Sequence, residues 1–166
     1  MPEASLPSSP DKEKIQVSRK INQKGLDLIK QFEGLELEAY PDPGTGGEPW
    51  TIGYGHTSPG KVKKGDKITE QEAEELLVKD IARFEDGVNQ LVRQPISLNQ
   101  FSALVSFSFN VGLWNLKSST MLALVNTNKL PEAALQFERW NKAAGKVLPG
   151  LVKRRKAEVA LFLLPD

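Results

Sequence analysis

The sequence predicts an α+β fold that is mainly α, with a small α/β-hairpin lobe joined by a long helix to a larger helical lobe. Three features of the sequence predict this architecture. Residues 36–57 are rich in turn formers and contain the alternating segment WTIGYG, whereas apolar residues recur at helical spacing over 73–91 and again over 98–107. The chain has 166 residues, of which 39% are hydrophobic and 26% charged, which is typical of a globular protein with a core of its own.

We expect one domain after a tail. Residues 1–19 are rich in proline, serine and charge, so they have little to bury and are predicted to be flexible. The domain then covers residues 20–166, with a small lobe at about 20–68, a connecting helix at 69–94 and a helical lobe at 95–166. Two lobes joined by a helix usually leave a cleft, and clefts are where ligands bind.

The small lobe is predicted to begin with a short helix. Asn22 is a suitable N-cap, and Gly34 stands where a glycine commonly follows a helix. Between them Leu26, Ile29 and Glu33 fall at i, i+3 and i+7, so a carboxylate is expected on the buried stripe of this helix. Short strands and a proline- and glycine-rich loop follow over 36–57.

Helices are predicted for the rest of the chain. Capping boxes at Thr69/Glu72 and at Ser97/Gln100 start two of them, and the first ends before Pro95. The second helix is apolar on several faces, as expected at the centre of a lobe. Three shorter helices are expected near Ser119–Asn126, Pro131–Asn141 and Gly150–Leu164.

Composition excludes several classes of function. The 22 basic and 21 acidic residues leave a net charge of +1, which gives no reason to expect nucleic acid as a partner. There is no cysteine, which excludes disulfides and thiolate metal sites, and a single histidine, His56, lacks the partners of a zinc ligand. The uncharged stretch 94–116 is interrupted by Pro95 and Gly112, so we expect a buried helix and no membrane insertion. No signal peptide is evident, which predicts a cytoplasmic protein.

Glu33 and Asp42 are the candidate reactive groups. A helix C-terminus and an apolar stripe both favour the protonated form of Glu33, as a general acid requires, whereas Asp42 in a solvated glycine-rich loop should stay ionised. Such a pair is typical of glycosidic bond hydrolysis, and the Thr51 hydroxyl can hold a water beside Asp42. The spacing leaves another interpretation open, in which Glu33 is a solvated helix end and Asp42 only forms a turn.

The segments IKQFEG, LELEAYPD and GEPWTIGYGHT, followed by FNVG and LPGLVKRRKAE, resemble the phage-type lysozymes of glycoside hydrolase family 24, which include the T4 phage lysozyme. The resemblance covers residues 21–164. It implies a lysozyme-like fold and an endolysin that hydrolyses the β-1,4 bond between N-acetylmuramic acid and N-acetylglucosamine in peptidoglycan. By this resemblance Glu33 is the general acid, Asp42 activates or balances the attacking water, and Thr51 positions it. No cofactor and no metal are implied.

One spacing departs from the family. Eight residues separate Asp42 from Thr51, where five are common, and we expect the extra residues to enlarge the loop without moving the strand. If a water lies between Asp42 and the sugar, as in the T4-like enzymes, the two carboxyl groups should be about 6.5–9.5 Å apart and the product inverted.

Other residues have two interpretations each. Tyr54 can stack on a sugar or pack in the core, whereas packing is favoured for Trp50. Asn110 can bind an N-acetyl group in the cleft or bind the backbone at a helix end. The resemblance favours the first interpretation. His56 is expected to support the site through a hydrogen bond.

The basic run 153–156 can be a lipid-binding face, but a solvated helix face is the favoured interpretation. One of its arginines can also turn inward and pair with an acidic residue of the small lobe. By resemblance to T4-like relatives, Arg154 is the expected partner of the catalytic glutamate.

Two other functions compete with hydrolysis. A lytic transglycosylase needs no activated water, so the presence of Asp42 and Thr51 argues against it. A non-catalytic wall-binding module would not need Glu33. The resemblance further implies that peptidoglycan is the substrate, that the protein is a monomer, and that a separate holin releases it to the cell wall.

Overall fold

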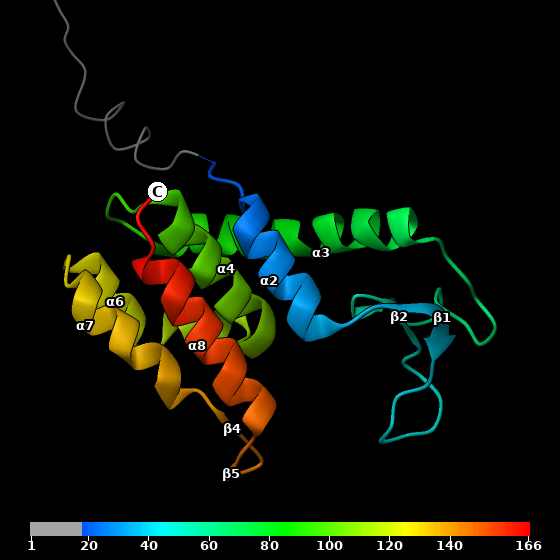
Figure 1. Ribbon diagram of the computed structural model, residues 1–166. Coiled ribbons are helices and arrows are strands. Elements are labelled where there is room, and N and C mark those ends of the chain that lie inside the picture. The colour runs from blue at the N-terminus through cyan, green and yellow to red at the C-terminus, as the bar shows by residue number, and fades with distance from the viewer. Residues whose placement is uncertain (1–17) are drawn as a thin grey trace, which may run out of the picture. The chain divides into compact units, whose positions relative to one another are not determined.

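The computed structural model describes residues 18–166, so almost all of the predicted tail lies outside the described residues. Figure 1 shows a mainly helical chain with a short sheet, which confirms the predicted α+β class. The helices are α2 (Gln23–Glu33), α3 (Glu70–Leu91), α4 (Leu98–Val111), α5 (Leu113–Lys117), α6 (Thr120–Asn126), α7 (Leu130–Gln136), η2 (Phe137–Arg139) and α8 (Pro149–Leu163). The strands are β1 (Glu36–Tyr40), β2 (Thr51–Gly53), β3 (His56–Thr57), β4 (Lys142–Ala143) and β5 (Lys146–Val147).

The described chain divides into two compact units. One is formed by Ile29–Arg83, and the other by the described residues up to Leu28 together with Phe84–Asp166. Helices α2 and α3 each contribute residues to both units. The lobe boundaries expected from the sequence stay a prediction, and the two units are described separately below.

The smaller unit contains an antiparallel sheet with the strand order β1-β2-β3. Tyr40 pairs with Thr51 across β1 and β2, and Ile52 pairs with His56 across β2 and β3. Ala39, Ile52 and Val62 form a small core, against which Trp50, Ile68 and Leu76 pack. The expectation that Trp50 packs is therefore confirmed, and the core fixes which face of the sheet is buried.

The predicted helix starts are confirmed by their caps. The Asn22 side chain accepts a hydrogen bond from the Gly25 N–H at 2.9 Å. Before α3, Thr69 and Glu72 exchange side-chain and backbone hydrogen bonds of 3.1 and 2.8 Å. Ser97 forms the equivalent capping box with Gln100 at the start of α4. Each cap satisfies backbone N–H groups that have no partner inside the helix.

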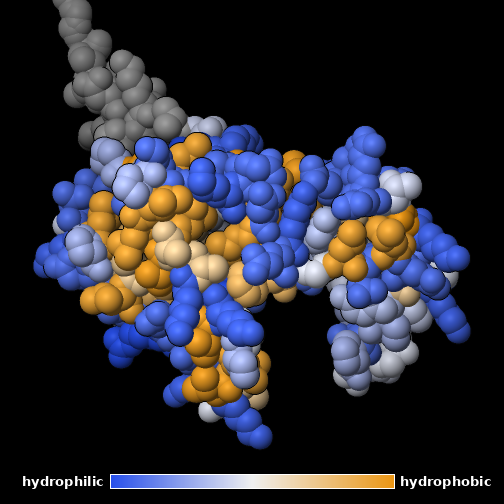
Figure 2. Space-filling model, in the orientation of Figure 1, coloured by the Kyte–Doolittle hydropathy of each residue, from blue (hydrophilic) through white to orange (hydrophobic). Residues whose placement is uncertain are grey.

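The larger unit is built around α4, which packs against α8. Phe101, Leu104 and Phe107 of α4 are fully buried. Phe107 meets Phe137 edge-to-face with ring centroids 5.4 Å apart, and Phe137 meets Phe162 in the same way. Figure 2 shows apolar residues gathered on the visible face of the helical unit. Within residues 18–166, no helix has the length and apolarity needed to cross a membrane.

Three elements of this unit differ from the prediction. A β-hairpin, β4–β5, lies between α7 and α8, where no strand was predicted. Its turn places Ala144 and Gly145 at φ +51° and +80°, and strands of two residues are too short to show an alternating pattern. The helix predicted over Pro131–Asn141 ends at Gln136 and continues only as the 3-10 turn η2, and the short helix α5 was not predicted.

Candidate active site

Glu33 is the last residue of α2 and belongs to the smaller unit. Gly34 follows at φ +76°, a left-handed conformation that ends the helix and leads the chain into β1. The Glu33 side chain is partly exposed. Burial raises the pKa of the Tyr40 phenol, and the carboxylates of Glu36 and Glu33 raise it further.

Gly55 lies directly against Glu33, a role that the sequence reasoning missed. A Cβ atom on Gly55 would lie 3.0 Å from Oε1 of Glu33, and Gly55 has φ +82°. The left-handed backbone favours glycine here, and a Cβ would press the end of the Glu33 side chain out of its place. The GxGH element carried the resemblance, but its glycines were given no role. In the sequence, the only signal for this contact was the second glycine of the GxGH element, which is Gly55 itself.

Replacing Gly55 by alanine is expected to damage the site as well as the fold. The left-handed backbone alone costs about 1–2 kcal/mol with a Cβ, and the displaced Glu33 carboxylate should lower peptidoglycan hydrolysis on the order of 10- to 100-fold. Gly60→Ala is the matched control, because Gly60 has φ +80° but no atom within 4 Å of the added Cβ. We expect Gly60→Ala to lower the free energy of unfolding without lowering activity. Equal activity losses in the two variants would contradict the role given to Gly55.

Asp42 both forms a turn and keeps a carboxylate oxygen available. Its Oδ2 accepts hydrogen bonds from the N–H groups of Gly44 and Thr45, at 2.9 and 3.1 Å. Its backbone N–H donates to the Gly47 carbonyl at 2.9 Å. Among residues 18–166, Oδ1 has no hydrogen-bond partner. The turn-forming interpretation is therefore correct for one oxygen, and it leaves the other able to accept a proton or a water.

Thr51 begins β2 at the other end of the long loop. It pairs with Tyr40 on one side and with Thr57 on the other, although the register of β1 against β2 shifts between Glu36 and Tyr40. The loop is held by its own hydrogen bonds, in which the Thr45 hydroxyl donates to the Glu48 carbonyl at 2.6 Å. Because Tyr40 and Thr51 are neighbours across the sheet and Asp42 is two residues beyond Tyr40, the pairing brings Asp42 and Thr51 to the same end of the β1–β2 pair.

His56 and Tyr54 both have structural contacts within the smaller unit. Nδ1 of His56 lies 2.8 Å from Oδ2 of Asp80 on α3, and the support that His56 gives to the site stays a prediction. Tyr54 is only 7% exposed, and the ammonium group of Lys30 lies 5.8 Å from the centre of its ring. Burial leaves little of the ring for a sugar to stack on. A substrate contact by Tyr54 stays a prediction.

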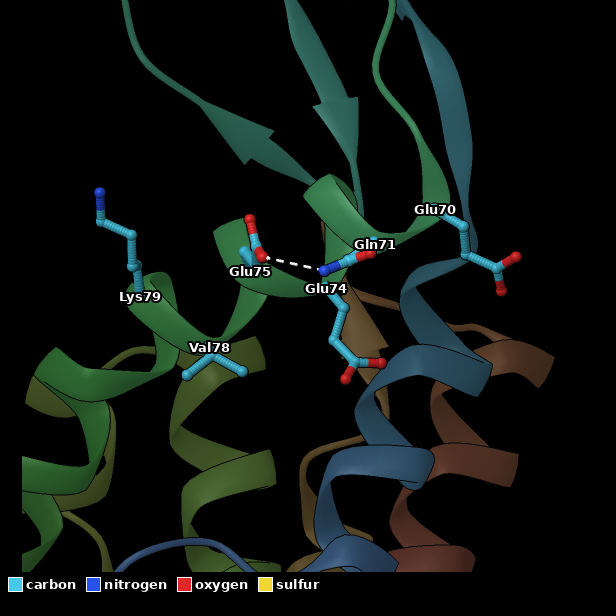
Figure 3. Close-up of a pocket in the computed structure, with 6 residues that line it drawn as sticks. All are labelled: Glu70, Gln71, Glu74, Glu75, Val78 and Lys79. Atoms are coloured by element: carbon cyan, nitrogen blue, oxygen red, sulfur yellow. Dashed lines mark hydrogen bonds between the residues drawn. The ribbon is translucent and has the colours of Figure 1, made fainter.

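A separate hollow of about 640 Å³ lies along the first turns of α3 (Figure 3). It is lined by Glu70, Gln71, Glu74, Glu75, Val78 and Lys79, and none of the predicted site residues is among them. The hollow contains three glutamates, but they do not form a metal site. Among the residues that the structure describes, no group of three or more metal-ligating side chains is placed to hold an ion. The hollow is therefore distinct from the candidate site.

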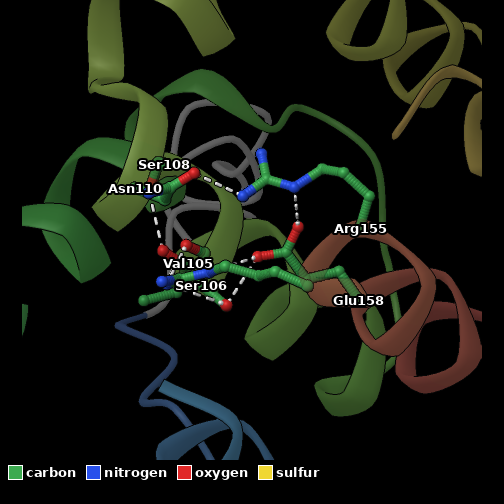
Figure 4. Close-up of polar contacts among 7 residues, drawn as sticks. Val105, Ser106, Ser108, Asn110, Arg155 and Glu158 are labelled. Carbon is green, nitrogen blue, oxygen red and sulfur yellow. Dashed lines mark hydrogen bonds and ion pairs between the residues drawn. The ribbon is translucent and has the colours of Figure 1, made fainter. Parts of the chain in front are cut away.

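Asn110 and Arg154 belong to the larger unit. Asn110, near the end of α4, is exposed, and its Oδ1 accepts a hydrogen bond from Nη2 of Arg155 (Figure 4). Arg154 is 3% exposed; its Nε donates to Glu158 at 3.2 Å and its Nη2 to the Ser106 carbonyl at 3.1 Å. The predicted pairing of Arg154 with the catalytic glutamate stays a prediction.

The interpretation of 153–156 as a solvated helix face is wrong for its two arginines. Lys153 and Lys156 are exposed, but Arg154 and Arg155 are buried. Glu158 lies four and three residues further along α8, so one buried carboxylate pairs with both guanidinium groups. Burial raises the pKa of the Glu158 carboxyl, while Arg155, Arg154 and the Ser106 hydroxyl act in the opposite direction. Burial likewise lowers the pKa of Arg155.

Comparison with known proteins identifies the family. The family model described as phage lysozyme matches residues 30–158, a range that contains Glu33, Asp42, Thr51, Asn110 and Arg154. The chain belongs to the phage lysozyme family. The predicted resemblance is thus confirmed over most of the domain.

Relatives of this family match most of the chain. An endolysin of Bacillus phage B103 is 48% identical over 143 residues, which are 86% of this chain and 54% of that protein. An endolysin of Salmonella phage P22 is 40% identical over 146 residues, covering 86% of this chain and 97% of the relative. The muramidase domain of SpmX from Asticaccaulis excentricus has a similar structure, with a TM-score of 0.80, 40% identity and coverage of 89% and 99%. The chain spans about half the length of the B103 endolysin.

Proposed function

We propose that this protein is a muramidase of the endolysin type, which hydrolyses the β-1,4 bond between N-acetylmuramic acid and N-acetylglucosamine in peptidoglycan and thereby lyses bacteria. Membership of the phage lysozyme family over residues 30–158 carries the proposal. The relatives from phages B103 and P22 are named endolysins, and the SpmX domain is named a muramidase. The presence of Glu33, Asp42 and Thr51 supports an active enzyme.

The proposed mechanism uses two carboxyl groups and one water. Glu33 donates its proton to the glycosidic oxygen as the bond to the anomeric carbon breaks. Asp42 accepts a proton from the water whose oxygen bonds to that carbon, and the Thr51 hydroxyl orients the water. The unbonded Oδ1 of Asp42 supports this role, because Oδ2 is already engaged in the turn. Side chains supply every proton transfer, so the proposal includes no cofactor and no metal.

Attack by water on the opposite face of the sugar inverts the anomeric carbon. We therefore expect the first product of digestion to carry the inverted configuration. Proton NMR spectra recorded before mutarotation distinguish the two anomers. A retained anomer would mean that Asp42 acts as a nucleophile instead of activating water.

Analysis of the products of purified peptidoglycan by mass tests the proposal. A hydrolase releases hydrated muropeptides with a reducing muramic end. Release of 1,6-anhydromuramic ends would instead identify a lytic transglycosylase on the same fold. Sedimentation of the protein with cell walls, without any release of reducing ends, would identify a non-catalytic wall-binding module.

The location and the oligomeric state of the protein are also part of the proposal. We propose a monomer that acts from the host cytoplasm and reaches the wall through a separate holin, although relatives from phages P21 and PA-2 are named SAR-endolysins. Light scattering of the purified protein tests whether it is a monomer. Fractionation of expressing cells, with and without a co-expressed holin, tests whether the protein stays in the cytoplasm until a holin releases it.

A further inference from the structure

A cavity of about 340 Å³ lies within the smaller unit, beside strands β2 and β3. Ile52 and His56 are direct neighbours across these strands, so their side chains share one face of the sheet, and both line the cavity. Successive residues of a strand point to opposite faces, so the side chain of Thr51 belongs to the other face. Glu33 and Asp42 do not line the cavity either. It is therefore separate from the candidate active site.

The floor of this cavity is apolar. Four branched aliphatic residues line it: Ile52, Val62, Ile68 and Leu76. They belong to the small core of the unit, so the packing of the sheet holds them in place. A cavity of this size, with mostly aliphatic walls and a few polar groups at its edge, is typical of a site for a small ligand or for part of a larger one.

The polar groups at the edge are mainly donors without partners. Ser58, Lys61 and Lys67 line the cavity, and within residues 18–166 their side chains form no hydrogen bond or ion pair. The lining also contains the carboxylate of Asp66, but its Oδ2 accepts a hydrogen bond from the backbone N–H of Lys63 at 2.9 Å. The two ammonium groups and the hydroxyl together favour an anion, and the aliphatic floor favours an anion that carries an apolar group.

We propose that this cavity binds the C-terminal carboxylate of a short aliphatic peptide. Lys61, Lys67 and Ser58 donate hydrogen bonds to the carboxylate, and the adjoining methyl groups of the peptide lie on the aliphatic floor. Peptides of the bacterial wall that end in alanine have this chemistry. The assignment of the ligand to peptidoglycan rests on the proposed function, and it gives that enzyme a second contact with its substrate, through the peptide instead of the glycan.

NMR titration with N-acetyl-D-alanyl-D-alanine tests the proposal. His56 lines the cavity and is the only histidine of the sequence, so in untagged protein its imidazole proton resonances report on this place alone. At constant pH and ionic strength we expect the dipeptide to shift these resonances saturably, with a Kd on the order of 1 mM. The C-terminal amide of the dipeptide lacks the charge, and inorganic phosphate lacks the methyl groups. Each should bind on the order of tenfold more weakly.

The double variant Lys61→Gln/Lys67→Gln removes both ammonium groups from the cavity. It should bind the dipeptide on the order of tenfold more weakly or worse. Lys63→Gln/Lys64→Gln is the matched control, because it makes the same change in charge in the same loop at two lysines that do not line the cavity. All four lysines are exposed, so we expect both double variants to fold. The control should bind the dipeptide as tightly as the parent does.

Three results would overturn the proposal. One is no saturable shift of the His56 resonances by the dipeptide, and another is equal binding of the amide or of inorganic phosphate. The third is an equal loss of affinity in the two double variants, which would assign the attraction to the net charge of the loop. The titration requires no hydrolysis. Dipeptide binding by a protein that releases no reducing ends from peptidoglycan would therefore contradict the proposed function alone, and release of reducing ends without dipeptide binding would contradict this inference alone.

Discussion

Replacing Glu33 by glutamine is expected to lower the rate of peptidoglycan hydrolysis on the order of 10²- to 10⁴-fold or more. Glutamine has nearly the shape of glutamic acid but has no carboxyl proton to give to the leaving oxygen. Because Glu33 is partly exposed at the end of α2, we expect the fold to be retained. The loss is measured as release of reducing ends from purified peptidoglycan under substrate saturation, so that it reports kcat.

Glu38→Gln is the matched control for this substitution. Glu38 is an exposed residue of β1 in the same unit, and its replacement makes the same change from carboxyl to amide. It should hydrolyse peptidoglycan at the rate of the parent. The melting temperatures of both variants show whether any loss is due to unfolding. A folded Glu33→Gln enzyme with the parent's activity would remove Glu33 from the role of general acid.

Local sequence signals predicted the elements on which the site is built. The capping boxes at Thr69 and Ser97 fixed where two long helices begin, and each is present in the structure. The glycine after Glu33 marked the end of α2 correctly. These signals succeed because a cap or a helix end depends on residues within four positions of one another. The position of Glu33 at the end of a helix therefore follows from the sequence.

Contacts between residues far apart in the chain were not predictable in the same way. The approach of Gly55 to Glu33 joins positions that are distant along the chain, and no local pattern indicates which backbone a carboxylate will meet. The sequence reasoning allowed one arginine of the basic run to turn inward, but it did not predict that both Arg154 and Arg155 are buried. A run of four basic residues is typical of a helix surface, and the sequence analysis gave no role to Glu158, the partner of both arginines. A buried ion pair has no hydrophobic periodicity to reveal it.

Glu158→Gln is expected to lower the free energy of unfolding by about 3–5 kcal/mol, because removing one partner of a buried ion pair leaves the other charge uncompensated. Here two arginines lose their shared carboxylate, and the Glu158 side chain is fully buried. Urea denaturation measures the change as a shift of the midpoint at constant slope. Glu132→Gln, at an exposed position in the first turn of α7, is the control and should cost less than about 1 kcal/mol.

Replacement of the other partner of the ion pair, Arg155→Met, should lower the free energy of unfolding by less than Glu158→Gln does. After Arg155→Met the carboxylate of Glu158 keeps Arg154 and the Ser106 hydroxyl as partners, so no buried charge is left without a counter-charge. Methionine also fills most of the volume of the arginine stem, although it loses the guanidinium group that lies 5.0 Å from the ring centre of Phe107. A larger loss for Arg155→Met than for Glu158→Gln would show that the packing of Arg155, and not the shared carboxylate, stabilises this part of the helical unit. A smaller loss of unfolding free energy for Arg155→Met than for Glu158→Gln would show that the Glu158 carboxylate stabilises this part of the unit. The role of Arg155 is then to hold the Asn110 amide through its hydrogen bond.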